Sequence, residues 1–286
     1  MKLDRPPFRI LTGQSPEDAA VDIVAAFESI ESAADKLGRV FATLCGQLQS
    51  DADEPLCAAG RALAAAIDAG AGQSHRNAYH NPQHFCEVML GAHFLCLLQG
   101  LGAVDSLRVV LAALIHDFHH DGSVNRDVAF RLERLALQEA APYLCSAGVS
   151  AVERRRLSAM VLATDVAHGL DFAIQCHAHH AGRASQPTVP AAAPELGELA
   201  QDPSTALQAL VLCQADLLPS TGLTPQHALR MQDRLSQEWR KPLALEDKLC
   251  FIDQILSAGI TCSYFIANLH GLRQTLADAG SAPRRA

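Results

Sequence analysis

Apolar residues recur every three or four positions along most of the chain, which is the spacing of one face of an α-helix. No alternating run of apolar and polar residues reaches the length of a strand, and Gly and Pro residues separate the periodic segments. The pattern predicts an all-α fold, a compact bundle of roughly ten helices. The expected helical segments are 19–37, 39–48, 56–69, 82–99, 104–116, 127–144, 150–162, 171–180, 204–217, 226–240 and 245–279, with a break in the last one near Gly259.

Three segments lack this periodicity. Residues 1–14 are expected to form an extended arm, and residues 280–286 a disordered tail. Residues 183–203 are rich in Pro and Ala and predict a long surface loop. Because candidate site residues lie on both sides of this loop, we expect one domain over residues 1–286.

The length, composition and net charge of the chain narrow the class of protein. A chain of 286 residues with 49% hydrophobic content can bury a large core, and its net charge of −8 argues against general binding to nucleic acid or to acidic membranes. Nine cysteines without a Cys-x-x-Cys pair indicate reduced thiols rather than disulfides. The N-terminus has no apolar signal-peptide core, and no stretch approaches the roughly 20 apolar residues of a membrane helix. We therefore expect a soluble, cytoplasmic protein.

The strongest chemical signal lies at the end of the apolar run 109–115, where His116 and Asp117 stand side by side. The run predicts a buried helix, and two polar side chains at its end are hard to explain by packing alone. Neutral imidazole and carboxylate together suit Zn²⁺, Mn²⁺, Fe²⁺ or Mg²⁺. The pair therefore predicts a metal site.

Three further residues can join this site. His80 and His84 flank the start of the helix expected from Pro82, so both can face one cavity, although a lone histidine there is usually structural. Asp216 lies within the apolar stretch 212–218, and a buried carboxylate costs several kcal/mol unless it is paired or bound to a metal. An ion pair with Arg or Lys is the alternative explanation for Asp216.

Taken in order, these residues resemble the HD-domain metal-dependent phosphohydrolases, and within them the catalytic domain of the class I cyclic nucleotide phosphodiesterases, in a stand-alone bacterial-type form. The resemblance rests on Tyr79-His80-Asn81-Pro82-Gln83-His84 followed by Val88, on residues 116–125, which are close to the family's His-Asp-x-x-His-Pro-Gly-x-x-Asn, and on the short motifs 162–165, 215–217 and 251–253. These motifs run in family order from residue 79 to residue 253.

The resemblance implies an all-α HD-type domain with a site for two metal ions. It assigns the tighter ion, Zn²⁺, to four ligands, and Asp117 would also bridge to a second ion, Mg²⁺ or Mn²⁺. The four implied ligands are His84, His116, Asp117 and Asp216. A hydroxide between the two ions would attack phosphorus, and His80 would act as the general acid that protonates the departing ester oxygen.

The resemblance also assigns supporting roles. His120 would take part in catalysis and, with Asp165, would hold metal-bound water. Glu133 would orient His80, and Phe251 would stack on the base of the substrate. Thr164 and Asn125 belong to the same motifs and would lie around the ligands.

Three departures from the family change this picture. Lys248 stands three residues before Phe251, where the family has a glutamine that reads the purine edge. Lysine donates hydrogen bonds but cannot accept them, so the usual purine recognition is not expected, and Lys248 can instead meet a phosphate or carboxylate or remain a solvated lysine. The segment between Gly122 and Glu133 is shorter than in the family, and Asp121 replaces a proline.

Three functions remain open at this point: a 3′,5′-cyclic nucleotide phosphodiesterase, an HD-type phosphomonoesterase acting on a nucleotide or another small phosphate, and a ligand sensor without turnover. The expected partner is a small phosphate ester, with no nucleic acid and no membrane; the sequence does not give the oligomeric state. His177, His179 and His180 form a further histidine-rich run. We interpret that run as an exposed helix end or the rim of a pocket rather than as a second metal site.

Overall fold

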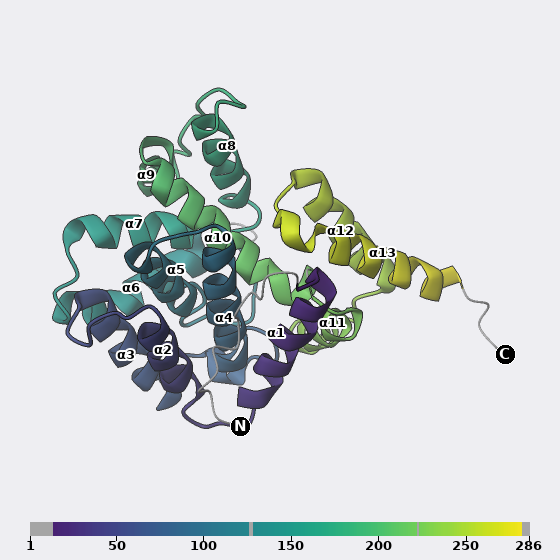
Figure 1. Cartoon of the computed structure of the whole chain (residues 1–286), viewed down its shortest axis with the longest axis horizontal. Coiled ribbons are helices and arrows are strands. Elements are labelled where there is room, and N and C mark those ends of the chain that lie inside the picture. Colours follow the sequence, from purple (N-terminus) through teal and green to yellow (C-terminus); the bar gives the residue numbers. More distant parts are fainter. Residues whose placement is uncertain (1–13, 126–127, 222, 282–286) are drawn as a thin grey trace.

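The computed structural model describes residues 14–125, 128–221 and 223–281 (Figure 1). Within these ranges there are thirteen α-helices, three short 3₁₀ turns and no strand, which confirms the expected all-α fold. The helices are α1 (Pro16–Ile30), α2 (Lys36–Gln47), α3 (Pro55–Asp68), α4 (Pro82–Leu98), α5 (Ala103–Ile115), α6 (Arg131–Ser146), α7 (Ala151–Leu162), α8 (Leu170–His180), α9 (Gly197–Gln201), α10 (Pro203–Thr221), α11 (Pro225–Glu238), α12 (Leu245–Ala258) and α13 (Ile266–Ser281). The 3₁₀ turns are η1 (Ser74–Arg76), η2 (Pro194–Leu196) and η3 (Ser263–Phe265).

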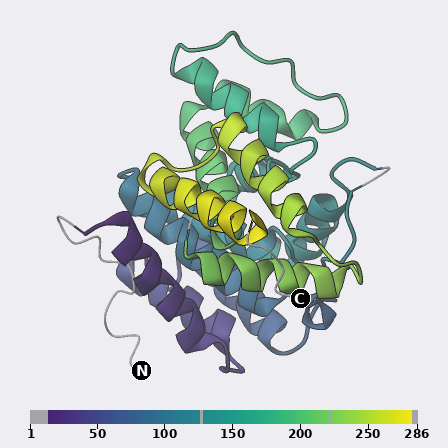
Figure 2. The same ribbon diagram turned by 90° about the vertical axis from the view of Figure 1, so that its right-hand side faces the viewer.

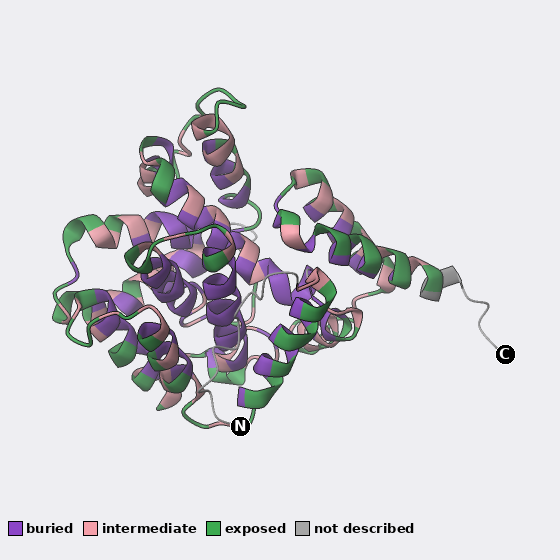
Figure 3. Cartoon of the chain, viewed as in Figure 1, coloured by how far each residue is buried: buried purple, intermediate pink, exposed green. Residues whose placement is uncertain are grey.

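Helices α4, α5 and α10 pack against one another at the centre of the molecule. Residues 83–96 of α4 and 106–115 of α5 are buried without interruption, as expected for helices that are apolar on every side. The remaining helices surround these three, and the buried residues concentrate along them (Figure 3). The polar side chains of the candidate site therefore project from the most buried helices of the protein.

Local signals fix where these central helices begin and end. Asn81 caps α4: its side chain accepts hydrogen bonds from the backbone N–H groups of Gln83 and His84, and Pro82 occupies the first helical position. Helix α5 ends at Ile115, so His116 and Asp117 follow directly after its last turn. Both signals were readable in the sequence, and they place three of the candidate ligands at the ends of buried helices.

The C-terminal helices form a separate layer. Helices α12 and α13 lie side by side, and α11 runs close to them (Figure 2). Gly259 ends α12 with φ +64°, a left-handed conformation that glycine adopts without strain. The expected break near Gly259 is therefore confirmed.

Three boundaries differ from the expectation. The helix expected over residues 19–37 ends at Ile30, and α2 begins only at Lys36. Helix α6 begins at Arg131 rather than at residue 127, which lies outside the described residues. The segment expected to be a surface loop contains η2 and α9, because Leu196 and Leu199 share one face and are fully buried.

The expectations for the two chain ends fall mostly outside the described residues, which begin at 14 and end at 281. All nine cysteines are free thiols, as the sequence indicated. No helix in the described ranges is long and apolar enough to cross a membrane.

Candidate metal centre and active site

The four expected ligands lie on, or directly after, three helices and converge on one point. His84 comes from the first turn of α4, His116 and Asp117 follow α5, and Asp216 lies within α10. The Nε2 atom of His84 lies 3.1 Å from Asp216 Oδ1 and 3.6 Å from Asp117 Oδ2. The Nε2 atom of His116 lies 3.2 Å from Asp117 Oδ2 and 3.5 Å from Asp216 Oδ1. We call these four residues the ligand cluster.

The hydrogen bonds of His116 show which of its ring nitrogens is free to face a cation. Its Nδ1 lies 2.7 Å from the carbonyl oxygen of Ala113 and must donate, since a carbonyl only accepts. In the neutral ring, Nε2 then presents a lone pair toward Asp117 and Asp216, and this buried atom has no hydrogen-bond partner in the described structure. Acceptors that face acceptors in a buried site need a proton or a cation between them. Burial lowers the pKa of His116, but Asp117 and Asp216 outweigh it and hold that pKa well above its usual range, so a metal ion bound here would take the place of a proton. Two imidazoles and two carboxylates suit a divalent metal ion.

The ionisation of the two carboxyl groups in the ligand cluster also suits a metal site. Burial opposes ionisation of Asp216, but hydrogen bonds and charge interactions with His116 and His84 outweigh burial and hold the pKa of that carboxyl well below its usual range. Burial likewise opposes ionisation of Asp117, and its histidine neighbours again lower the net pKa. Both carboxylates are therefore ionised at neutral pH, as metal ligands must be.

A second pair lies beside the ligand cluster and joins His80 to Glu238, the last residue of α11. Glu238 Oε2 accepts from the backbone N–H groups of Tyr79 and His80 at 2.7 and 2.9 Å, and Oε1 lies 2.5 Å from His80 Nδ1. Burial lowers the pKa of His80, but Asp117 and Glu238 outweigh it and the net shift is upward. His80 is thus held by one ring nitrogen and protonated more readily than a free histidine.

His120 completes this part of the site. Its ring stacks on that of His80 with centroids 3.8 Å apart. Its Nδ1 accepts from the backbone N–H of Gly122, so the proton of the neutral ring lies on Nε2. Burial and the neighbouring His80 lower the pKa of His120 to about 4. His120 therefore stays neutral at physiological pH, and His80 is the more readily protonated of the two rings.

Glu133 does not contact His80 as the resemblance implied. Its Oε2 accepts from Asn125 Nδ2 at 2.7 Å, and the same amide donates to Asp165 Oδ2 at 3.1 Å. Helix α6 begins only at Arg131, so its first turn brings Glu133 to Asn125, and the carboxylate that bonds His80 is that of Glu238. The sequence carries no local signal for this contact, because the two residues are 158 positions apart.

Asp165 organises the loops around the site. Its two oxygens accept from the backbone N–H groups of Phe130, Ala167 and His168 in addition to Asn125. The neighbouring Thr164 donates to the carbonyl oxygen of Val161. Burial, followed by the charges of Asp165 and Asp117, raises the pKa of Glu133 to about 7.

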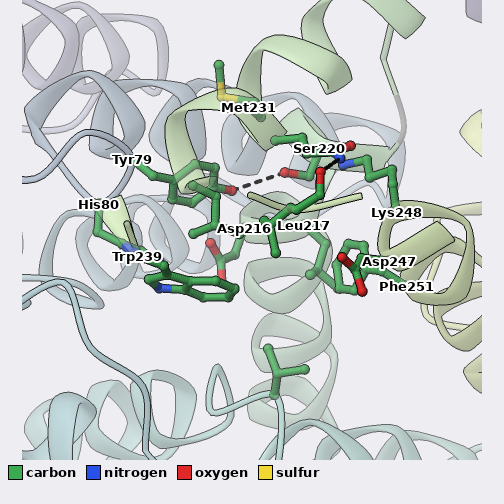
Figure 4. A pocket seen from close by; sticks show the side chains of 14 residues that line it. Tyr79, His80, Asp216, Leu217, Ser220, Met231, Trp239, Asp247, Lys248 and Phe251 are labelled. Atoms are coloured by element: carbon green, nitrogen blue, oxygen red, sulfur yellow. Dashed lines mark hydrogen bonds between the residues drawn. The ribbon is translucent and has the colours of Figure 1, made fainter. Parts of the chain in front are cut away.

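A cavity of about 290 Å³ opens beside both clusters. His80 and Asp216 line one end, and Lys248 and Phe251, one turn apart on α12, line the other (Figure 4). Trp239 lies across the cavity from Phe251, and most of the remaining wall is apolar. Four of the expected site residues, His80, Asp216, Lys248 and Phe251, therefore line one cavity, and the rest of the ligand cluster lies beside Asp216.

The histidine-rich run lies elsewhere. His177, His179 and His180 are half-buried at the end of α8, and none of them lines this cavity. His180 Nε2 contacts the carbonyl oxygen of Leu199, and His179 Nδ1 that of Ala184. These contacts hold the segment after α8 against the helix.

Comparison with solved structures defines the class of this fold. The phosphodiesterase domain of the RhoPDE fusion protein from the choanoflagellate Salpingoeca rosetta matches 97% of this chain over 93% of its own, with 18% identity and a TM-score of 0.55. LmjPDEB1, solved in complex with IBMX, matches 93% of this chain over 92% of its own, with 14% identity and a TM-score of 0.64. The chain has the fold of the class I phosphodiesterase catalytic domains, as the sequence motifs implied.

A curated protein shares a short segment of sequence. The probable 3′,5′-cyclic phosphodiesterase pde-1 of Caenorhabditis elegans is 40% identical over 55 residues, which are 18% of this chain and 8% of that protein. This chain therefore matches only a small part of the length of that relative. No protein-family model matches the chain.

Proposed function

We propose that this protein is a metal-dependent phosphodiesterase that hydrolyses a 3′,5′-cyclic nucleotide. The observation that carries the proposal is that two clusters meet at the end of one cavity where His80 and Asp216 line it: the four residues of the ligand cluster, and a histidine whose carboxylate partner favours its protonated form. Cleavage of a phosphate ester needs both, because charge develops on the phosphate oxygens and the departing oxygen needs a proton. The fold of known phosphodiesterases supports the same reading.

His84, His116, Asp117 and Asp216 would hold the tighter ion, Zn²⁺, and Asp117 would also contact a second ion, Mg²⁺ or Mn²⁺. When bound, such ions offset negative charge on the phosphate and lower the pKa of water. The protein's own contribution is to keep both carboxylates ionised and to fix the tautomer of His116 through Ala113.

His80 would protonate the departing ester oxygen. Glu238 occupies its Nδ1, which leaves the Nε2 proton for the substrate in the cavity that His80 lines. The stacked His120 would donate its Nε2–H to a water molecule or a phosphate oxygen, since its Nδ1 is held by Gly122. Phe251 would offer a ring face to the base at the far end of the cavity.

The test is hydrolysis of cyclic AMP and cyclic GMP by purified protein with added Mn²⁺ or Mg²⁺, with the His80→Ala variant alongside. We expect turnover that falls by about 10²-fold or more in the variant, the effect of losing a general acid. Bis(p-nitrophenyl) phosphate and p-nitrophenyl phosphate extend the test to a diester and a monoester without a base.

The assay also separates the two other functions. Faster release of p-nitrophenol from the monoester would make the protein a phosphomonoesterase, the function that the buried cation Lys248 in the cavity favours as a contact for a charged group. Tight binding of a cyclic nucleotide without turnover, with bound metal established by elemental analysis, would make it a ligand sensor.

A further inference from the structure

Lys248 is the one cation that lines the far end of the cavity among the described residues. Its side chain is 7% exposed, and the surrounding wall includes the apolar side chains of Leu217, Met231 and Leu243. Among the described residues no hydrogen bond or ion pair involves its Nζ, and burial lowers the pKa of the amine to about 8. A buried amine without a hydrogen-bond or ion-pair partner is costly for folding alone, so its place in the cavity points to a ligand.

The neighbouring acidic residue does not serve as its partner. The Asp247 carboxylate is held by the start of α12, where it accepts a hydrogen bond from the backbone N–H of Ala244 at 2.7 Å. Asp216, at the other end of the cavity, is engaged by His84. The amine of Lys248 therefore remains available to a molecule that enters the cavity.

The surroundings of Lys248 suit the edge of a planar ring. Its Nζ lies 5.7 Å from the centroid of the Phe251 ring, one helical turn further along α12. Trp239 lies on the opposite side of the cavity (Figure 4). A flat base between these two side chains would lie with its faces against aromatic carbon and with one edge toward the amine.

We propose that Lys248 makes the cavity select guanine over adenine. Guanine presents two acceptors, O6 and N7, on one edge, and lysine donates to both, whereas adenine replaces O6 by an amino group that is itself a donor. A lysine cannot accept from that amino group. The inference rests on the proposed function and gives it a substrate, cyclic GMP.

The test compares binding and turnover of three cyclic nucleotides: cyclic GMP, cyclic AMP, and cyclic IMP, which keeps O6 and N7 but lacks the 2-amino group of guanine. Binding is measured by calorimetry and by the fluorescence of Trp239, the only tryptophan in the chain, on the metal-loaded His80→Ala variant, in which turnover is slow. The ratio of kcat/KM values is measured on the metal-loaded protein. We expect the affinity and the kcat/KM value for cyclic GMP and for cyclic IMP to exceed those for cyclic AMP by about tenfold or more.

Two variants and a control assign the effect to this side chain. Lys248→Met keeps the length of the side chain and removes the donor. We expect it to weaken the binding and turnover of cyclic GMP and cyclic IMP, which brings their ratio to cyclic AMP close to one. Lys248→Gln, which can accept as well as donate, is expected to strengthen cyclic AMP. Lys241→Met is the matched control, because Lys241 is exposed and does not line this cavity, and it should leave the ratio unchanged.

The outcomes separate this inference from the proposed function. Equal binding of all three nucleotides, a preference for cyclic AMP, no binding at all, or an unchanged ratio in Lys248→Met would overturn the role of Lys248. Bis(p-nitrophenyl) phosphate carries no base, so its hydrolysis tests the phosphodiesterase activity alone. Failure to hydrolyse it would remove the proposed function even where guanine selection is observed in binding.

Discussion

The two histidine–carboxylate groups of the site look alike in sequence but differ in how their protons are matched. In the pair of His80 and Glu238, every carboxylate oxygen meets a donor, from the imidazole or from the backbone. In the ligand cluster, the Nε2 lone pair of His116 faces the oxygens of two carboxylates. The first group is complete when its imidazole is protonated, whereas the second holds two imidazoles and two carboxylates around one point, a donor set that suits a divalent cation. This difference supports the proposal that the first group transfers a proton and the second binds a metal ion.

The sharpest way to break this comparison is to remove a ligand. His116→Ala takes away the nitrogen that both carboxylates face, and we expect loss of bound metal and loss of turnover to the detection limit. Elemental analysis after dialysis and steady-state hydrolysis measure the two effects. His93→Gln is the control, since His93 is buried on α4 but lies outside both groups and should leave the metal content unchanged. Full metal content and full activity in His116→Ala would refute the assignment of the ligand cluster.

The second group should fail in a different way. Glu238→Gln keeps the shape of the side chain but removes the charge that favours protonated His80, so we expect kcat to fall by about tenfold to a hundredfold. Because Glu238 acts through His80, the KM and the metal content should stay within about twofold of the parent protein. Glu133→Gln is the matched control, since the structure bonds Glu133 to Asn125 rather than to His80. A larger loss in Glu133→Gln than in Glu238→Gln would reverse the assignment of the positioning residue.

The same comparison shows which site residues and helices could be predicted from the sequence. His116 and Asp216 were predictable because a polar side chain inside an apolar helix needs a physical reason to be there. The helices were predictable from periodicity and from caps such as Asn81. The partner of His80 was not, because Glu238 ends the amphipathic helix α11 and its position beside His80 depends on how α11 packs against the rest of the chain. Tertiary packing of distant segments leaves no local pattern.

The segment 183–203 teaches the same lesson. Its Pro and Ala residues predict a loop, but Leu196 and Leu199 find a buried position against α7 and α10, and a short helix forms there. Composition describes what a segment can do alone, and burial against neighbours overrides it.

Metal removal should affect stability as well as activity. Without a metal ion, Asp117 and Asp216 remain close together and negatively charged. We therefore expect EDTA to lower the melting temperature of the unsubstituted protein, and Zn²⁺ or Mn²⁺ to restore it. At a free metal concentration of about 100 times Kd, binding stabilises the folded state by about 2.7 kcal/mol. Differential scanning calorimetry measures the shift, and the His116→Ala variant should lack it. The Glu238→Gln variant should keep it, because the pair of His80 and Glu238 needs no metal. An identical response of both variants would contradict the separation of the two groups.

Glu133 extends the comparison, because it is a buried carboxyl group whose hydrogen-bond partner is the amide of Asn125 rather than a histidine. Burial and the charges of Asp165 and Asp117 raise its pKa from 4.5 to about 7, so the folded protein holds this proton to a higher pH than the unfolded chain. Its contribution to stability is therefore full below pH 4.5 and is lost as the pH rises through 7, which amounts to about 3 kcal/mol. Glu133→Gln keeps the hydrogen bond from Asn125 possible but cannot ionise. Urea unfolding between pH 5 and 7.5 should therefore show a stability difference in favour of the variant that grows with pH, and a constant difference would show that Glu133 titrates like an exposed carboxyl.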